Sequence, residues 1–297
     1  MARFGATLGS ELGVNMRVSV IQMSPQSDKA ENIAQAEALI GRALAADRAD
    51  MVALPEIWTC LGGTRAGKFA AAETLPSPGS GEAGGPAYEF LRRMAVAHKV
   101  FVHGGSIGEL GGDLGGEKLY NTSLVFSPAG TELARYRKIH LFDITTPDGQ
   151  GYKESNTYGA GDAVVSCELD GLKIGLAICY DLRFPELFLA LRRQNVDLIV
   201  LPAAFTLQTG KDHWEVLLRA RAIETQCYIA APACTGSYTE GKGETRFTYG
   251  HALIADPWGH VIAKASDGIG WASAAIDTEY LRKVRANIPV LEHRKLA

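Results

Sequence analysis

Cysteine is sparse in this sequence, and its spacing excludes two common roles. The chain has 297 residues and five cysteines, Cys60, Cys167, Cys179, Cys227 and Cys234. The count is odd, there is no Cys-x-x-Cys pair, and no cysteine–histidine cluster has the spacing of a zinc site. We therefore expect free thiols, no metal site, no disulfide framework, and a reducing compartment, the cytoplasm.

Long apolar runs and an excess of one charge sign are also missing. No apolar run approaches the roughly 18 residues that a membrane-spanning helix needs. Thirty Lys and Arg are balanced by 33 Asp and Glu, for a formal net charge of −3. Nucleic acids and anionic membranes attract concentrated positive charge. The sequence therefore predicts neither as a partner, and a small molecule is the expected ligand.

Short runs rich in Val and Ile alternate with amphipathic segments along the chain. A strand-like run at 17–23 precedes helical spacing of apolar residues over 29–47, and another strand-like run follows at 49–55. Since 46% of the residues are hydrophobic and no linker interrupts the alternation, the pattern predicts a single α/β domain over residues 16–297. Residues 1–15 lack the apolar middle of a signal peptide, and we expect an appended or disordered leader.

Other segments give more local predictions. Residues 119–137 resemble a hairpin that turns at Pro128–Gly130, because proline and glycine favour turns. Helices are expected at 86–98, 185–194 and 213–226, and an extended tail from residue 288. The glycine-rich stretches 104–116 and 236–243 are interpreted as long surface loops.

The stretch GLAICYDLRFPEL, from Gly175 to Leu187, places a cysteine at a corner. The apolar run ends at Cys179, and Pro185 begins a helix-like segment. A free cysteine is often just a small buried hydrophobe. Alternatively, Cys179 is a nucleophile presented at a strand-to-helix turn, which would need a base and an oxyanion donor. None of the seven histidines lies in a recognisable cysteine-protease context.

Two other residues are better candidates for that chemistry. Glu56 ends the run MVALPE, and ligands gather beyond the carboxyl ends of strands in α/β sheets. Partial desolvation there makes a carboxylate a usable base. Lys138 in RYRKIHLFD is followed at once by apolar residues, which indicates that it turns toward the core. Each residue could equally be a solvated surface charge, and the two interpretations stay open on the residues alone.

Taken together, three motifs resemble those of the nitrilase, or carbon–nitrogen hydrolase, superfamily. They are LPEIW around Glu56, YRKIHLFD around Lys138 and ICYDLRFPEL around Cys179, in the chain order of that family. The resemblance continues through KLYNTSLVF, ESNTYGAGD, HWEVLLRARAIETQCY, YGHALIADPWG and LRKVRANIPVLEHRK, and so covers nearly the whole chain.

The resemblance implies a four-layer αββα sandwich, often assembled as a homodimer or a higher homo-oligomer. It implies that Glu56 is the base, Cys179 the nucleophile, and Lys138 with the backbone N–H of Tyr180 the oxyanion donors, with no cofactor. It also implies that Glu154 in YKESNTY positions the substrate and Lys138. The charge of Lys138 is expected to lower the pKa of the Cys179 thiol.

Arg183 is a candidate for binding a substrate carboxylate, because guanidinium pairs with carboxylate in a bidentate manner. The alternative is an internal salt bridge among Asp181, Arg183 and Glu186 that braces the turn.

Several segments look most like the Nit-type amidases, which include deaminated-glutathione amidase and ω-amidase. The resemblance therefore implies hydrolysis of an amide bond in a small carboxylate-bearing substrate through a thioester. The favoured substrate is deaminated glutathione, giving 2-oxoglutarate and cysteinylglycine, and 2-oxoglutaramate is the alternative. A nitrilase or carbamoylase, a thiol oxidoreductase, or a catalytically silent binding scaffold are the other hypotheses. The segment 235–248 is expected to line the pocket and to influence this choice.

Overall fold

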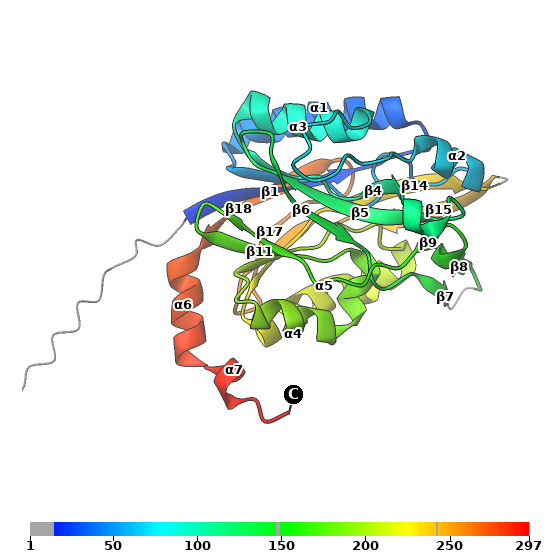
Figure 1. The fold of residues 1–297 in the computed structure, drawn as a ribbon. Coiled ribbons are helices and arrows are strands. Elements are labelled where there is room, and N and C mark those ends of the chain that lie inside the picture. The colour runs from blue at the N-terminus through cyan, green and yellow to red at the C-terminus, as the bar shows by residue number, and fades with distance from the viewer. Residues whose placement is uncertain (1–14, 147–148, 242, 297) are drawn as a thin grey trace, which may run out of the picture.

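Two stacked β-sheets form the centre of the computed structural model, and helices cover the outer face of each (Figure 1). The structure describes residues 15–146, 149–241 and 243–296. The predicted leader therefore lies outside the described residues, apart from Asn15, which begins the first strand. The four layers are those of the predicted αββα sandwich.

The first sheet is mixed and is ordered β15-β14-β1-β2-β3-β5-β4 in the described part of the chain. β18 also pairs with β1, and β6 and β9 pair with β5. The strands are β1 (Asn15–Met23), β2 (Met51–Ala53), β3 (Phe101–His103), β4 (Ile107–Leu110), β5 (Leu119–Phe126), β6 (Glu132–Arg137), β9 (Tyr158–Gly159), β14 (Ala233–Glu240), β15 (Glu244–Tyr249) and β18 (Gly270–Asp277).

The second sheet is ordered β10-β11-β12-β13-β16-β17, and β7 pairs with β8 in a separate ribbon. Its strands are β10 (Ser166–Leu169), β11 (Leu172–Leu176), β12 (Leu198–Val200), β13 (Tyr228–Ala231), β16 (Leu253–Ala255) and β17 (Val261–Lys264), and the ribbon contains β7 (Asp143–Thr145) and β8 (Gly151–Lys153). β11, β12 and β13 are parallel, so their carboxyl ends meet at one edge.

Helices α1 and α3 cover the first sheet, and α4 and α5 cover the second (Figure 1). The α-helices are α1 (Lys29–Asp47), α2 (Arg65–Ala71), α3 (Pro86–His98), α4 (Pro185–Arg193), α5 (Leu207–Thr225), α6 (Thr278–Asn287) and α7 (Val290–His293), and the 3-10 turns are η1 (Gly112–Leu114), η2 (Glu154–Asn156) and η3 (Cys179–Arg183). Asp28 caps α1 by accepting a hydrogen bond from the backbone N–H of Glu31.

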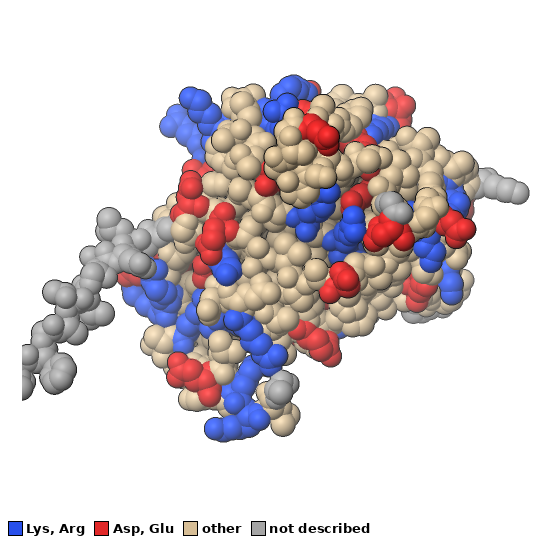
Figure 2. All heavy atoms as spheres, viewed as in Figure 1, with Lys and Arg blue, Asp and Glu red and all other residues tan. Residues whose placement is uncertain are grey.

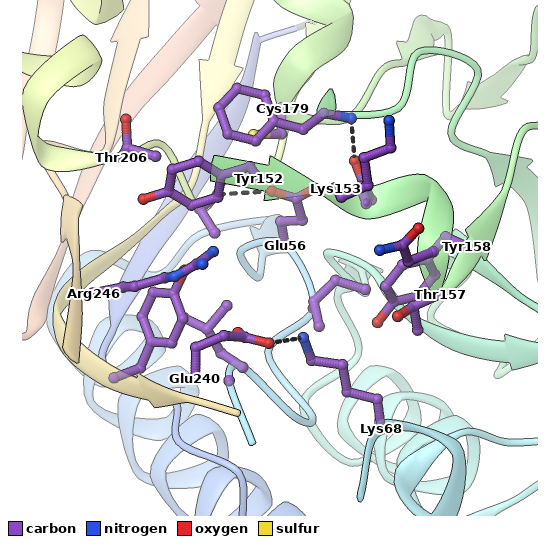
Figure 3. Close-up of a pocket in the computed structure, with 18 of the residues that line it drawn as sticks. Glu56, Lys68, Tyr152, Lys153, Thr157, Tyr158, Cys179, Thr206, Glu240 and Arg246 are labelled. Atoms are coloured by element: carbon purple, nitrogen blue, oxygen red, sulfur yellow. Dashed lines mark hydrogen bonds and ion pairs between the residues drawn. The ribbon is translucent and has the colours of Figure 1, made fainter. Parts of the chain in front are cut away.

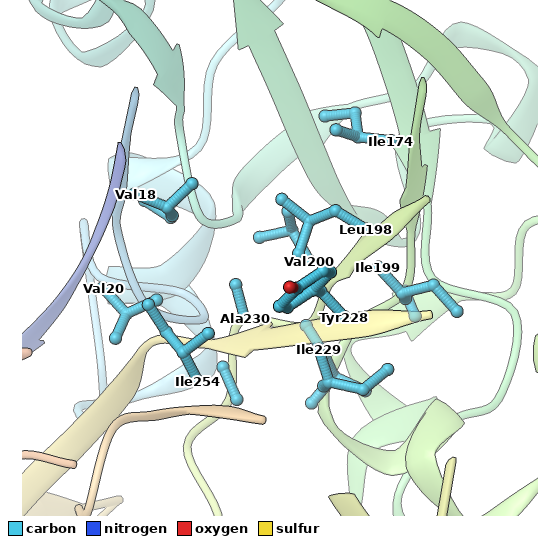
Figure 4. Close-up of a cluster of buried hydrophobic side chains, with 14 of the residues drawn as sticks. Val18, Val20, Ile174, Leu198, Ile199, Val200, Tyr228, Ile229, Ala230 and Ile254 are labelled. Atoms are coloured by element: carbon cyan, nitrogen blue, oxygen red, sulfur yellow. The ribbon is translucent and has the colours of Figure 1, made fainter. Parts of the chain in front are cut away.

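The largest cluster of buried side chains lies between the two sheets. In β1, Val18 and Val20 point across to Val200, Ala230 and Ile254 of the second sheet (Figure 4). The alternate residues of β1 and β2 face α1 and α3 instead. This period of two explains why both strands contribute buried apolar residues to both faces of the sheet. Figure 2 shows both signs of charge on the face in view, with Lys and Arg gathered over α6 and α7.

Four local predictions were wrong. The glycine-rich stretch 104–116 is not a long surface loop, because residues 104–109 are buried and Ile107–Leu110 forms β4, which pairs with β5. The tail contains the short helix α7, whose N-cap is Pro289; proline is compatible with a helix start. α5 begins at Leu207, six residues before the predicted start. The prediction missed the first turns because Gly210 interrupts the apolar spacing; a glycine is needed there since Tyr249 leaves no room for a Cβ. The glycine-rich stretch 236–243 belongs to the β14–β15 hairpin, and Gly241 and Gly243 supply positive φ at its turn.

Candidate active site

A cavity of about 440 Å³ opens beyond the ends of strands from both sheets. Its lining includes Glu56, Lys138, Glu154 and Cys179, so the structure brings together four residues that the sequence analysis selected. Glu56 lies three residues beyond β2, and Cys179 lies three residues beyond β11. The αββα stacking therefore places one end of each sheet against the same cavity (Figure 3).

Glu56 is almost completely buried, with 5% of its surface exposed. One carboxylate oxygen, Oε1, accepts hydrogen bonds from Lys138 Nζ at 2.8 Å and Asn121 Nδ2 at 3.0 Å. The other oxygen, Oε2, accepts the backbone N–H of Ala204 at 2.8 Å. These three donors fix the plane of the carboxylate, and the alternative of a solvated strand-end glutamate is wrong.

Lys138 is 1% exposed and lies between two carboxylates. Its Nζ is 2.8 Å from Glu56 Oε1 and 2.9 Å from Glu154 Oε2. Burial opposes the charged ammonium, but the charges of Glu154 and Glu56 raise the pKa of Lys138 well above its ordinary value. The lysine is therefore a permanently protonated donor, and its interpretation as a solvated surface residue is wrong.

Asn121 in β5 is a site residue that the sequence analysis did not single out. Its amide nitrogen donates to Glu56 Oε1 at 3.0 Å and to Glu154 Oε1 at 3.2 Å, so it bridges the two glutamates that hold Lys138. The side chain is fully buried. A single asparagine in a strand has no diagnostic spacing. The sequence therefore pointed to Asn121 only through its place in the family-like stretch KLYNTSLVF.

Cys179 has a positive φ of 46° at the start of η3, a conformation that is costly for a residue with a side chain. Its backbone N–H donates to the carbonyl of Pro202 at 2.9 Å, which fixes the turn. Burial raises the pKa of the Cys179 thiol well above its usual range, and the charge of Glu56 adds to this, whereas Lys138 lowers it. Lys138 thus lowers the pKa of the thiol, as expected, but burial and the charge of Glu56 outweigh its effect.

The raised pKa has a chemical consequence. The Cys179 thiol hydrogen-bonds to the Glu56 carboxylate, so the geometry allows a thiolate to form by proton transfer to that group. A buried thiol beside a buried carboxylate in a strained turn is an arrangement that can support covalent catalysis.

A family model described as carbon-nitrogen hydrolase matches residues 17–286 of this chain. The chain belongs to the carbon–nitrogen hydrolase family. A deaminated glutathione amidase of Synechocystis sp. is 42% identical, over 93% of this chain and 97% of that protein. Omega-amidase NIT2 of Xenopus tropicalis is 40% identical, over 94% of this chain and 95% of that protein.

Solved structures agree with this assignment to the nitrilase superfamily. Saccharomyces cerevisiae Nit3 matches with a TM-score of 0.82 at 28% identity, over 95% of this chain and 97% of that one. The Caenorhabditis elegans NitFhit protein matches with a TM-score of 0.81 at 34% identity. The match covers 95% of this chain but 65% of the NitFhit chain.

In this carbon–nitrogen hydrolase, Asp181 braces the turn that carries Cys179. Its fully buried carboxylate accepts the Tyr136 hydroxyl at 2.7 Å and the backbone N–H groups of Ile178 at 2.8 Å and His140 at 3.1 Å. These contacts tie the turn that carries Cys179 to the segment on both sides of Lys138. Asp181 therefore braces the turn, but the expected salt bridge with Arg183 and Glu186 does not form among the described residues.

Replacing Asp181 by Asn should lower the free energy of unfolding by about 2–3 kcal/mol, because one carboxylate oxygen becomes a donor and leaves buried donors unpaired. The value of kcat should fall as well, since the turn loosens. Glu186→Gln, at an exposed position in the same segment, is the matched control and should change stability by less than about 0.5 kcal/mol. Urea unfolding measures both, and equal effects would contradict the bracing role.

Arg183 and Tyr180 lie near the cavity without being part of its described lining. The guanidinium of Arg183 lies 5.4 Å from the ring centre of Phe205, a lining residue, and its nitrogens approach His213 Nδ1 at 3.3 Å. The Tyr180 ring packs against Phe142 and Phe184. Carboxylate binding by Arg183 and oxyanion donation by the Tyr180 N–H stay predictions.

The β14–β15 hairpin contributes Tyr238, Glu240 and Arg246 to the cavity, as expected for segment 235–248. Within the described ranges, His, Cys, Asp and Glu do not form a group of three or more that could hold a metal ion. Among the helices that the structure describes, none has the length and apolar character to cross a membrane.

Proposed function

We propose that this protein is an amidase that hydrolyses a linear carbon–nitrogen bond through a thioester on Cys179. The observation that carries the proposal is the buried contact of Glu56, Lys138 and Cys179 in one cavity. A base, a permanent cation and a nucleophile are the groups that acyl transfer needs.

In the proposed first half-reaction, Glu56 takes the proton of the Cys179 thiol as sulfur attacks the amide carbonyl. Lys138 and the Tyr180 N–H donate to the oxyanion, and each such donor is typically worth about 3 kcal/mol. Glu56 returns the proton to the leaving amine, and the carbon–nitrogen bond breaks to leave a thioester.

In the second half-reaction, Glu56 removes a proton from water, which attacks the thioester. The carboxylic acid leaves, and the proton returns to the sulfur of Cys179. Glu154 and Asn121 hold Lys138 and Glu56 in place throughout. No cofactor takes part in this sequence. Assembly as a homodimer or a higher homo-oligomer stays a prediction.

The substrate that we propose is deaminated glutathione, which would give 2-oxoglutarate and cysteinylglycine. The relative named deaminated glutathione amidase supports this choice, and so does a cavity roomy enough for a tripeptide-sized acid. The second candidate is 2-oxoglutaramate, because the relative named omega-amidase NIT2 is almost as similar.

Release of 2-oxoglutarate from each substrate tests the proposal. We expect kcat/KM for deaminated glutathione to exceed that for 2-oxoglutaramate by at least about tenfold, which corresponds to ~1.4 kcal/mol of transition-state binding. The reverse ratio would assign the protein as an ω-amidase. No release from either substrate, with ammonia formed from a simple nitrile, would contradict the amidase proposal.

A further inference from the structure

The charges that line the cavity are unevenly distributed. Around the nucleophile, Lys138 is matched by the carboxylates of Glu56 and Glu154. The rest of the described lining contains four cations and a single carboxylate: Arg65, Lys68, Lys153, Arg246 and Glu240. The part of the cavity remote from the triad is therefore electropositive, which favours an anionic group on the bound molecule.

Three of these cations either already bind protein groups or are exposed to solvent. Arg65 donates to the backbone carbonyls of Asn156 and Glu117, and Lys68 Nζ pairs with Glu240 at 2.6 Å. The Lys153 side chain is 66% exposed, so water screens its charge. Arg246 is the remaining candidate.

Arg246 is held rigidly, and its donors are incompletely used. Its side chain is 13% exposed and its guanidinium lies 4.3 Å from the ring centre of Tyr152. One terminal nitrogen donates to the Gly151 carbonyl and to Glu244, both at 3.1 Å. Its Nε is buried and has no hydrogen-bond partner among the described residues. In Figure 3 the side chain extends from β15 toward the middle of the cavity, below Tyr152 in that view.

The hairpin that carries Arg246 is fixed by backbone hydrogen bonds to the segment at Gly62 and Gly63, which also borders the cavity. The N–H of Gly63 donates to the Thr239 carbonyl at 2.7 Å, and the N–H of Gly241 donates to the Gly63 carbonyl at 2.9 Å. Gly62 approaches so closely that an added Cβ would lie 2.3 Å from the Thr239 oxygen. The position of the guanidinium is thus built into the fold, as a selective binding group requires.

We propose that Arg246 binds a carboxylate on the leaving group of the substrate. The inference rests on the proposed amidase function and deepens it. A guanidinium pairs with a carboxylate in a bidentate manner, whereas its existing partner Glu244 is half exposed and contributes little. Cysteinylglycine carries a terminal carboxylate, and the ammonia released from 2-oxoglutaramate has none. Arg246 therefore selects deaminated glutathione over a primary amide.

The first test compares two substrates on wild type, Arg246→Gln and Arg246→Lys. The substrates are deaminated glutathione and its analogue with a C-terminal carboxamide. Arg246→Gln should raise KM for the acid by about 10–100-fold, the effect of losing a charge-assisted pair, with kcat nearly unchanged. Its KM for the carboxamide should stay within about twofold. Arg246→Lys should be intermediate, because it keeps the charge but loses the planar fork.

Arg93→Gln, which removes an exposed guanidinium on α3 that pairs with Glu37, is the matched control and should leave both KM values unchanged. Thermal unfolding of each variant checks that the hairpin is intact. An equal rise of KM for both substrates in Arg246→Gln would overturn the inference, and so would equal KM values for the two substrates in wild type.

A binding measurement separates this inference from the proposed function. In the Cys179→Ala background, calorimetry compares glutaryl-cysteinylglycine with its C-terminal amide. The acid should bind at least about tenfold more tightly, and adding Arg246→Gln should abolish the difference. If that difference appears while wild type hydrolyses neither amide, the inference stands and the proposed function fails. If wild type is active but the affinities are equal, the inference fails alone.

Discussion

Replacing Cys179 by alanine is expected to reduce kcat by at least about 10⁴-fold, because loss of a covalent nucleophile removes the whole two-step route. The protein should stay folded. The change removes only one buried sulfur, and the backbone contact to Pro202 is unaffected. Release of 2-oxoglutarate measures the activity, and thermal unfolding measures the stability.

Cys60 provides the matched control for that experiment. It is a second free, buried cysteine in the lining of the same cavity, and burial raises the pKa of its thiol too. Cys60→Ala should keep activity within a few-fold of wild type. Wild-type activity in Cys179→Ala would contradict the mechanism. Equal losses in both variants would favour thiol oxidation–reduction chemistry that uses the two sulfurs.

Replacing Lys138 by methionine should be the most destabilising change in the site. The variant leaves the carboxylates of Glu56 and Glu154 buried together without their cation. Removing one partner of a buried charge cluster typically costs about 3–5 kcal/mol of unfolding free energy. Turnover should also be lost, because the oxyanion loses its charged donor. Lys283→Met, at an exposed surface pair, is the control and should cost less than about 0.5 kcal/mol.

The loss of stability in Lys138→Met should depend on pH. Near neutral pH the variant carries two unpaired buried carboxylates, and a proton bound by either one relieves their repulsion. The stability difference from wild type should therefore shrink as the pH falls toward 5. Urea unfolding at several pH values measures this, and a difference that is constant with pH would contradict the electrostatic explanation.

At high pH the wild-type protein should itself lose stability. Because the pKa of Lys138 is raised in the folded protein, its stabilising contribution is complete below the ordinary lysine value of about 10.4 and is lost as the pH rises through the folded value. Lys138→Met lacks this contribution.

The layers of the fold and the meeting of Glu56 and Cys179 in one cavity could be predicted from sequence because their signals are local. Apolar residues at helical spacing predicted α1, and Pro86 indicated the start of α3. Glu56 and Cys179 each follow a short apolar strand, and parallel strands bring their carboxyl ends to one edge.

The remaining site residues depend on contacts that sequence spacing does not encode. Asn121 acts by bridging two glutamates from distant segments, and Asp181 acts through Tyr136 and His140. Arg246 lies in a hairpin whose glycines resembled a loop, because Gly241 and Gly243 signal a turn without revealing the paired strands on each side.

The central claim is a thioester on Cys179, and peptide mass spectrometry tests it most directly. Wild-type protein would be mixed with deaminated glutathione, quenched in acid during turnover, and digested. We expect the 2-oxoglutaryl acyl group on the peptide that contains Cys179, no modification of the Cys60 peptide, and no adduct in Cys179→Ala. Continued release of 2-oxoglutarate with Cys179 unmodified at every time point would contradict the mechanism.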